Sequence, residues 1–142
     1  LTPANLFVAD FMGSPAMNLL HANVRKNGSA TELHIERPTG APLVLRDNAV
    51  PDLPERVVVG IRPEDITEEL GRGHKNTHVA SCMIEVVEPA GADTFVLLNL
   101  SSKEVTARLK AETPVQPGQE MEFAFNMDKA SYFDVDSGER IN

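Results

Sequence analysis

Short apolar stretches of period two, separated by turns, recur along most of this chain and constrain its fold more than any other feature. Leu20, Ala22 and Val24 alternate with polar residues, and Asn27-Gly28 follows as a hairpin signal. Such alternation is typical of a strand with one face buried and the other in solvent. A succession of short strands, each ended by glycine or proline, predicts an all-β barrel or sandwich.

One apolar run does not alternate. The residues from Val57 to Ile61 form a continuous β-branched stretch, which predicts a strand buried on both faces. Arg62-Pro63 ends this strand, because proline lacks a backbone donor. Alternation in a later strand places Val86 on the core side. Further strands are predicted at 33–35, 43–45, 81–86, 95–100, 105–109, 121–126 and 132–133, with turns at 38–42, 88–91 and 114–118.

The first residues follow a helical pattern instead. Phe7 and Phe11 recur at helical spacing, and Gly13 and Pro15 stop the pattern. We therefore expect a short amphipathic helix within residues 1–14. A helix of this length needs a partner for its apolar face, since it is too short to be stable alone.

Composition excludes several classes of protein. The formal net charge is -8 over 142 residues, whereas nucleic acids and anionic lipids are bound through clustered Lys and Arg. No apolar stretch approaches the roughly 20 residues of a membrane-spanning helix. The single cysteine, Cys82, allows no internal disulfide and fits a reducing compartment.

Catalytic motifs are missing from the sequence. No glycine is followed by Lys-Ser or Lys-Thr, so there is no P-loop, and no G-x-S-x-G elbow occurs. We therefore predict no catalytic residues and no nucleotide-binding residues in this chain.

His74, His78 and Cys82 are spaced by four and are residue types that bind zinc. A loop histidine, a strand-start histidine and a buried thiol explain them more simply, because structural zinc sites usually have four ligands. We predict no metal site. The other polar group follows the buried strand: Arg62, Glu64 and Asp65 could form a site there, or a solvated turn with weak ion pairs.

Four motifs, in order, resemble one family. Pro3 to Asn18 (PANLFVADFMGSPAMN) closely resembles a segment of the ATP-binding subunits of sugar and glycerol-3-phosphate ABC importers. Val59 to Glu64, Glu88 to Asp93 and Phe133 to Ile141 are similar to later motifs of these subunits. The order and spacing of the motifs extend the resemblance over essentially the whole chain.

The resemblance implies the C-terminal regulatory part of such a subunit. Its fold would be tandem OB-like lobes of the TOBE type with a short N-terminal helix. Residues 1–14 would lead from an absent upstream ATPase domain, and residues 15–142 would form the regulatory domain, with possible lobes 15–70 and 71–142. ATP and Mg²⁺ would be bound by the upstream domain, so we expect no cofactor and no catalysis in this fragment.

The resemblance also implies partners. The subunit would pair with a second copy, and the chain would contact its own ATPase domain, the permease subunits and, in some members, a regulatory protein or an internal ligand. Its location would be cytoplasmic, on the inner face of the membrane through the transporter. We expect no nucleic acid partner and no direct membrane insertion.

Candidate joint and interface residues come from the first two motifs. The helix face would pack on the β domain or the upstream domain, the segment after the helix would form the joint, and the turn after the buried strand would lie at an interface. These residues are Phe7, Phe11, Ser14, Pro15, Asn18, Gly60, Arg62, Glu64 and Asp65. Maintenance of the fold is the alternative role for each of them.

A small-ligand module is the alternative function. The spacing of Ser14, Asn18 and Val24 is similar to that in molybdate-binding relatives of the same fold, which hold oxyanions at subunit interfaces. An oxyanion site needs backbone amides, hydroxyls and often a cation. Pro15 removes one amide, and the nearest cation, Arg25, lies several residues further on, so the sequence favours the transporter role.

Overall fold

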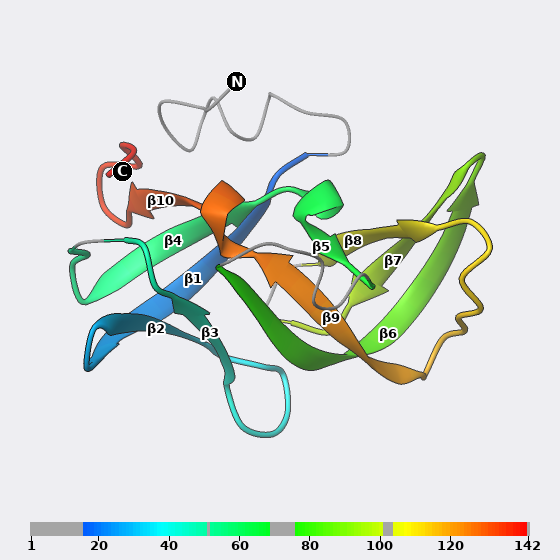
Figure 1. Ribbon diagram of the computed structural model, residues 1–142, viewed down its shortest axis with the longest axis horizontal. Helices are drawn as coiled ribbons and strands as arrows, with labels where there is room; N and C mark the ends of the chain where they lie inside the picture. The colour runs from blue at the N-terminus through cyan, green and yellow to red at the C-terminus, as the bar shows by residue number, and fades with distance from the viewer. Residues whose placement is uncertain (1–15, 51, 69–75, 101–103, 142) are drawn as a thin grey trace.

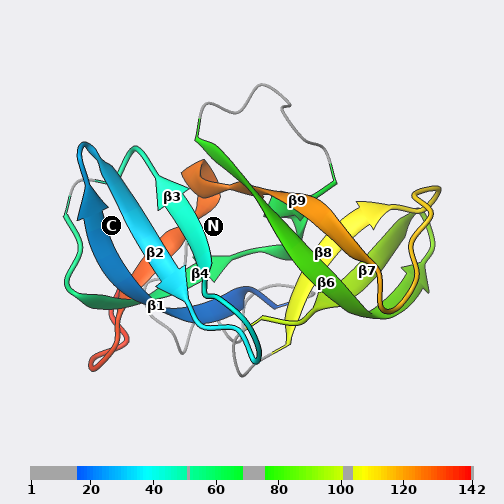
Figure 2. The ribbon, with the colours of Figure 1, turned by 90° about the horizontal axis from the view of Figure 1, so that it is seen from below.

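The computed structural model describes residues 16–50, 52–68, 76–100 and 104–141. These residues form ten strands and two short 3-10 helices, η1 (Pro63–Asp65) and η2 (Met127–Lys129). Figures 1 and 2 show two strongly twisted sheets side by side. The strands are β1 (Asn18–Asn27), β2 (Ala30–Ile35), β3 (Leu43–Asp47), β4 (Arg56–Ile61), β5 (Ile66–Thr67), β6 (Thr77–Ala90), β7 (Asp93–Leu98), β8 (Val105–Lys110), β9 (Glu120–Asn126) and β10 (Ser131–Asp134).

The first sheet has the order β10-β4-β1-β2-β3. Strands β1 and β2 pair antiparallel up to Asn27 and Ala30, so Gly28 and Ser29 form the two-residue turn that the sequence predicts. Gly28 has φ 67, a left-handed conformation that glycine adopts without strain. The predicted hairpin is confirmed.

Strand β4 lies inside the first sheet, between β10 and β1. Its residues from Val57 to Ile61 are all buried, as the continuous apolar run predicts. Val57 and Val59 face the main core, whereas Val58 packs with Met17 and Phe133 in a small second cluster on the other face. The two-sided burial is therefore real, and each face of β4 has its own apolar partners.

The second sheet has the order β5-β9-β6-β7-β8. A β-bulge in β6 shifts the register between Ile84 and Val86, and this bulge makes one prediction wrong. The extra residue turns Val86 outward, where it is 40% exposed, and Val87 packs against the core instead. Strand β6 also continues through Ala90, so the chain reverses at residues 91–92 and not over 88–91.

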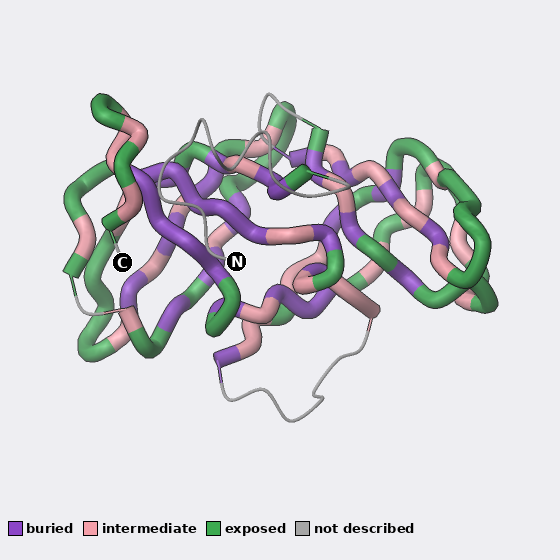
Figure 3. Tube along the Cα trace, turned by 90° about the horizontal axis from the view of Figure 1, so that it is seen from above, coloured by how far each residue is buried: buried purple, intermediate pink, exposed green. Residues whose placement is uncertain are grey.

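One core joins the two sheets. The main cluster includes Leu20 and Ile35 from the first sheet, and Cys82 and Phe123 from the second. Figure 3 shows buried residues where the sheets meet and exposed residues toward the ends of the hairpins. The all-β, OB-like fold class is confirmed. The expected helix within residues 1–14 lies outside the described part of the chain.

The sheets follow the possible lobes 15–70 and 71–142 except for one strand each. Strand β5 comes before residue 70 but pairs with β9 of the second sheet. Strand β10 comes after residue 71 but pairs with β4 of the first sheet. These two exchanges tie the halves of the chain together. Over the residues that the structure describes, no helix is long and apolar enough to cross a membrane.

Candidate functional site

Asn18 lies where the two sheets join. Its Nδ2 donates to the carbonyl oxygen of Thr106 at 2.8 Å, and its Oδ1 accepts from the Thr106 backbone N–H at 2.9 Å. Thr106 belongs to β8, an end strand of the second sheet. The Asn18 amide therefore takes the place of a neighbouring strand at this edge, and the predicted joint residue connects β1 of one sheet to β8 of the other.

A second side chain also covers the β8 edge. Glu68 accepts from the backbone N–H of Lys110 at 2.9 Å and from the Thr113 hydroxyl at 2.6 Å. Edge strands with unpaired backbone groups invite association with other chains. The side chains of Asn18 and Glu68 thus bond backbone groups at two positions of this edge.

Gly60 is buried in β4 beneath the second cluster. A Cβ atom at this position would lie 2.5 Å from the Met17 sulfur and 2.9 Å from Cε2 of Phe133. Glycine is therefore required because these two side chains approach the backbone closely, and not because of a left-handed backbone conformation. The structure gives Gly60 a packing role, and an interface role for it stays a prediction.

Arg62, Glu64 and Asp65 lie together around η1, which contacts β8. The Asp65 backbone N–H donates to the Arg62 carbonyl at 2.9 Å and closes the turn. Burial raises the pKa of the half-buried Asp65 carboxyl, and the nearby charge of Glu64 raises it further. Glu64 itself is exposed. The predicted turn exists, and its interface role is still untested.

Four further candidates, Phe7, Phe11, Ser14 and Pro15, lie outside the described residues. So does His74 of the possible metal group. Cys82 is fully buried in the core, and burial raises the pKa of its thiol to about 11. Burial lowers the pKa of His78. In the described ranges, no three His, Cys, Asp or Glu side chains are grouped so that they could hold a metal ion.

A buried polar cluster around Asp47 was not predicted. Tyr132 Oη donates to Asp47 Oδ2 at 2.6 Å, Asn76 Nδ2 donates to Oδ1 at 2.6 Å, and the Ala49 backbone N–H donates to Oδ1 at 2.9 Å. Burial, and then the bond to Asp47, raises the pKa of Tyr132. Strands β3 and β10 are opposite edges of the first sheet, so the Asp47 carboxylate connects both edges to the start of β6.

No local signal identifies the Asp47 cluster, because its two main members are 85 residues apart in the chain. The same holds for Asn18 and Thr106, which are 88 residues apart. Only the rule that a buried carboxylate must have hydrogen-bond partners could have raised the question. That rule does not identify the partners.

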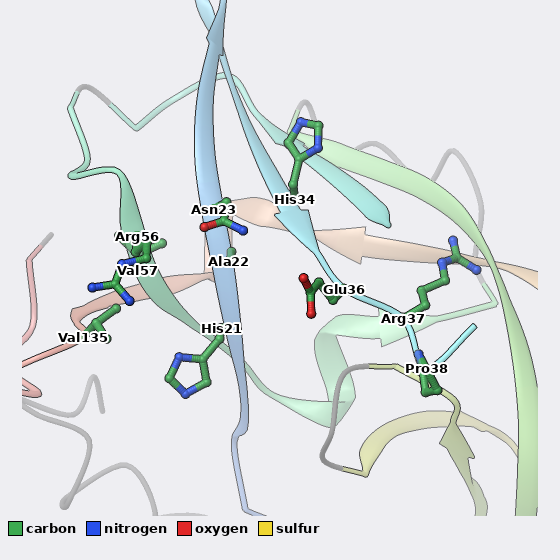
Figure 4. Close-up of a pocket in the computed structure, with 10 residues that line it drawn as sticks. All are labelled: His21, Ala22, Asn23, His34, Glu36, Arg37, Pro38, Arg56, Val57 and Val135. Carbon is green, nitrogen blue, oxygen red and sulfur yellow. The ribbon is translucent and has the colours of Figure 1, made fainter. Parts of the chain in front are cut away.

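A hollow of about 740 Å³ opens on the outer face of the first sheet. In Figure 4, β1 crosses its middle, with Arg56 and Val135 on one side and Glu36 on the other. Its lining combines charged and polar residues with four apolar ones. The lining residues are His21, Ala22, Asn23, His34, Glu36, Arg37, Pro38, Arg56, Val57 and Val135. None of the candidate residues from the sequence lies in it.

Two family models match the chain. Residues 13–66 match the MalK OB fold domain, and residues 59–133, more than half of the chain, match the TOBE domain. The overlap of the two matches falls on β4 and η1, where the first sheet passes into the second. The chain belongs to the TOBE domain family.

Similar proteins among curated sequences are import ATP-binding proteins. MsmX of Bacillus subtilis, an oligosaccharides import ATP-binding protein, is 34% identical over 98% of this chain and 38% of its own length. UgpC of Cupriavidus metallidurans, for sn-glycerol-3-phosphate import, is 33% identical over 98% and 38%. SugC of Mycobacterium tuberculosis, for trehalose import, is 34% identical over 98% and 41%. The chain thus spans about two fifths of the length of these relatives.

A similar solved structure is the cytoplasmic molybdate-binding protein ModG with molybdate bound. Its TM-score is 0.50 at 15% sequence identity, and the match covers 81% of this chain and 94% of that chain. At this identity the likeness concerns the fold alone.

Proposed function

We propose that this chain is the C-terminal regulatory and dimerisation domain of the ATP-binding subunit of a carbohydrate or glycerol-3-phosphate ABC importer. The carrying observation is that import ATP-binding proteins match 98% of the chain, together with the MalK OB fold and TOBE matches. The sequence has no P-loop. We therefore assign ATP, Mg²⁺ and catalysis to a part of the subunit beyond these 142 residues.

The domain would act through contacts and not through bond-making. A contact between two regulatory domains that persists while the ATPase halves separate would raise their effective concentration for each other. An effector would shift the transport cycle only by its differential affinity for two arrangements. In this proposal the subunit works in the cytoplasm against the permease, and the turn around Arg62 and Glu64 is the candidate interface.

The joint at Asn18 supports a rigid role for the domain. Asn18 and the Asp47 cluster fix the two sheets to each other through buried hydrogen bonds. A force applied to one sheet would therefore move the whole domain, which a regulatory unit between two ATPase halves requires.

The alternative function is oxyanion binding, and the structure engages Asn18, one of its candidate residues, in other hydrogen bonds. Thr106 takes one Nδ2 donor and the Oδ1 acceptor of Asn18, which leaves Asn18 only its second N–H for an anion. The ModG likeness extends to the fold only, because the identity is 15%. We therefore prefer the transporter role.

A domain exchange tests the proposal. The matching region of MsmX would be replaced by this chain, and oligosaccharide uptake measured in cells that lack MsmX. We expect the chimera to restore uptake, because the chain would supply the missing regulatory contacts. A chimera that accumulates and hydrolyses ATP without restoring uptake would contradict the proposal.

The solution mass of the isolated chain provides a second readout. Sedimentation equilibrium should show a dimer with a Kd of about 10 μM or tighter if the domain itself helps to pair the subunits. ATP hydrolysis by the isolated chain would contradict the assignment of catalysis to the rest of the subunit.

A further inference from the structure

The hollow on the outer face of the first sheet contains polar side chains without protein partners. Within the described part of the chain, the side chains of His21, Asn23, Glu36 and Arg56 make no hydrogen bond or ion pair. Small-molecule sites are concave and carry a few convergent polar groups that fix the orientation of the ligand. The volume of about 740 Å³ lies within the range of such sites.

The neighbouring part of the same sheet face is different. There Glu32 accepts from Asn27 at 3.1 Å and from Arg46 at 3.0 Å, and its other oxygen lies 3.2 Å from His34 Nε2. The hydrogen bonds from Asn27, Arg46 and His34 lower the pKa of Glu32 to about 2. The charges of Glu32 on β2 and Arg46 on β3 are thus satisfied within the protein, whereas Arg56 on β4 and Glu36 after β2 have no side-chain partner in the described residues.

The groups without protein partners include both a cation and an anion. Arg56 lies on one side of β1 and offers a guanidinium, the group best suited to hold a planar or tetrahedral anion. Glu36 lies on the other side, and its carboxylate points toward β1, while the Arg37 guanidinium points away from β1 (Figure 4). A carboxylate accepts hydrogen bonds from hydroxyl groups and repels anions. His21 and Asn23 lie between these two sides.

From this arrangement we propose that the hollow binds a small hydroxylated phosphate ester, such as a sugar phosphate. The phosphate would contact Arg56 and His21, and the hydroxyls would donate to Glu36 and bond with Asn23. A bare oxyanion would leave Glu36 unpaired, and a neutral sugar would leave Arg56 unpaired. The inference rests on the geometry of the hollow and stands independently of the proposed importer role.

Binding to the 142-residue chain tests the inference. The probes are glucose 6-phosphate, glucose and inorganic phosphate, each followed by amide NMR shifts and by calorimetry. We expect glucose 6-phosphate to bind with a Kd on the order of 0.1 mM and to shift the amides of Ala22, Asn23 and Val57. Glucose and inorganic phosphate should each bind at least about tenfold more weakly, since each lacks one of the two recognised groups.

Substitutions locate the two ends of the ligand. Arg56→Gln should weaken glucose 6-phosphate about tenfold and leave the affinity for glucose unchanged. Glu36→Gln should weaken glucose 6-phosphate severalfold and leave the affinity for inorganic phosphate unchanged. Arg108→Gln is the matched control, because Arg108 is an exposed arginine on β8 of the other sheet.

Several results would overturn the inference. One is the absence of saturable binding of glucose 6-phosphate up to about 20 mM. Others are equal affinity for inorganic phosphate or for glucose, which would indicate a simple anion site or a sugar site. Equal loss in Arg56→Gln and Arg108→Gln would indicate non-specific attraction. Loss of uptake by the MsmX chimera contradicts the importer role alone, so the two failures are distinguishable.

Discussion

At the scale of single residues, this fold depends on a few side chains whose role is set by one close contact. Gly60 is glycine because Met17 and Phe133 occupy the space of a Cβ. Asn18 is an amide because the edge of β8 offers both a donor and an acceptor at Thr106. In each case the residue type follows from its tertiary neighbour and not from its position within the strand.

Asn18→Asp tests the joint between the sheets. The aspartate keeps the size of the side chain but loses the Nδ2 donor, and it places a carboxylate oxygen against the Thr106 carbonyl. Because Asn18 is 6% exposed, we expect a loss of about 2–3 kcal/mol in the free energy of unfolding, measured by urea denaturation.

Asn23→Asp is the control for this experiment. Asn23 lies on the same strand but is exposed, and its side chain makes no hydrogen bond within the described residues. We expect a change of less than about 0.5 kcal/mol. Similar losses for the two variants would show that the Thr106 contact does not hold the sheets together.

At the scale of elements, the first three strands are joined by a charged cluster as well as by their ladder. Glu32 on β2 accepts hydrogen bonds from Asn27 on β1 and from Arg46 on β3. Cross-strand pairs of this kind fix the register of neighbouring strands. The cluster therefore supports the hairpin that the Asn27-Gly28 turn begins.

The pKa of Glu32 predicts an acid dependence of stability. The folded value is about 2 and the ordinary value is 4.5, so Glu32 contributes stability above pH 4.5. The contribution is lost as the pH falls toward about 2, because the unfolded chain then binds the proton more readily.

Glu32→Gln should therefore reduce the fall in stability between pH 4.5 and pH 2. The measurement is urea denaturation at a series of pH values. Glu36→Gln is the matched control, because Glu36 follows the same strand, is exposed and has no ion pair in the described part of the chain. An identical acid slope for Glu32→Gln and the native chain would rule out the contribution of the cluster.

At the scale of the whole molecule, two sets of contacts hold distant parts of the chain together. The exchange of β5 and β10 connects the sheets through backbone pairing. The Asp47 carboxylate connects β3, β10 and the start of β6 through side chains. Together these contacts join the two sheets into one unit. Two family models match this chain, and their matches overlap.

Tyr132→Phe tests the hydrogen bonds of the Asp47 carboxylate. Removal of the hydroxyl leaves one carboxylate oxygen of Asp47 without its 2.6 Å donor in a buried site. We expect a loss of about 1–3 kcal/mol in the free energy of unfolding.

Asp47→Asn and the double variant complete a cycle, since coupled residues give non-additive losses. We expect the double variant to lose less than the sum of the single losses. Additive losses would mean that the Tyr132 to Asp47 bond contributes nothing beyond the two separate side chains.

Much of the fold follows from local patterns. Alternation predicts β1, β2 and β8, the continuous run predicts the two-sided burial of β4, and Asn27-Gly28 predicts the first hairpin. These patterns work because burial on one face or on two leaves a periodic record in the chain. The bulge in β6 leaves no such record, so alternation places Val86 on the wrong face.

The candidate site was predictable in part. The motifs identified Asn18, Gly60 and the turn after β4 as special, but not the partners that make them so. The hollow was missed because its walls come from β1, β2, β4 and the turn after β10, which no sequence window contains.

Strand periodicity, turn residues and ordered motifs are local properties, so most strands and the family of this protein can be predicted from the sequence. How the elements meet follows from the three-dimensional arrangement: which edge Asn18 completes, which carboxylate Tyr132 reaches, and which polar groups face the hollow without partners. The physical reason is distance along the chain. Contacts between residues 85 or 88 positions apart depend on the path of the whole backbone, and no local pattern encodes that path.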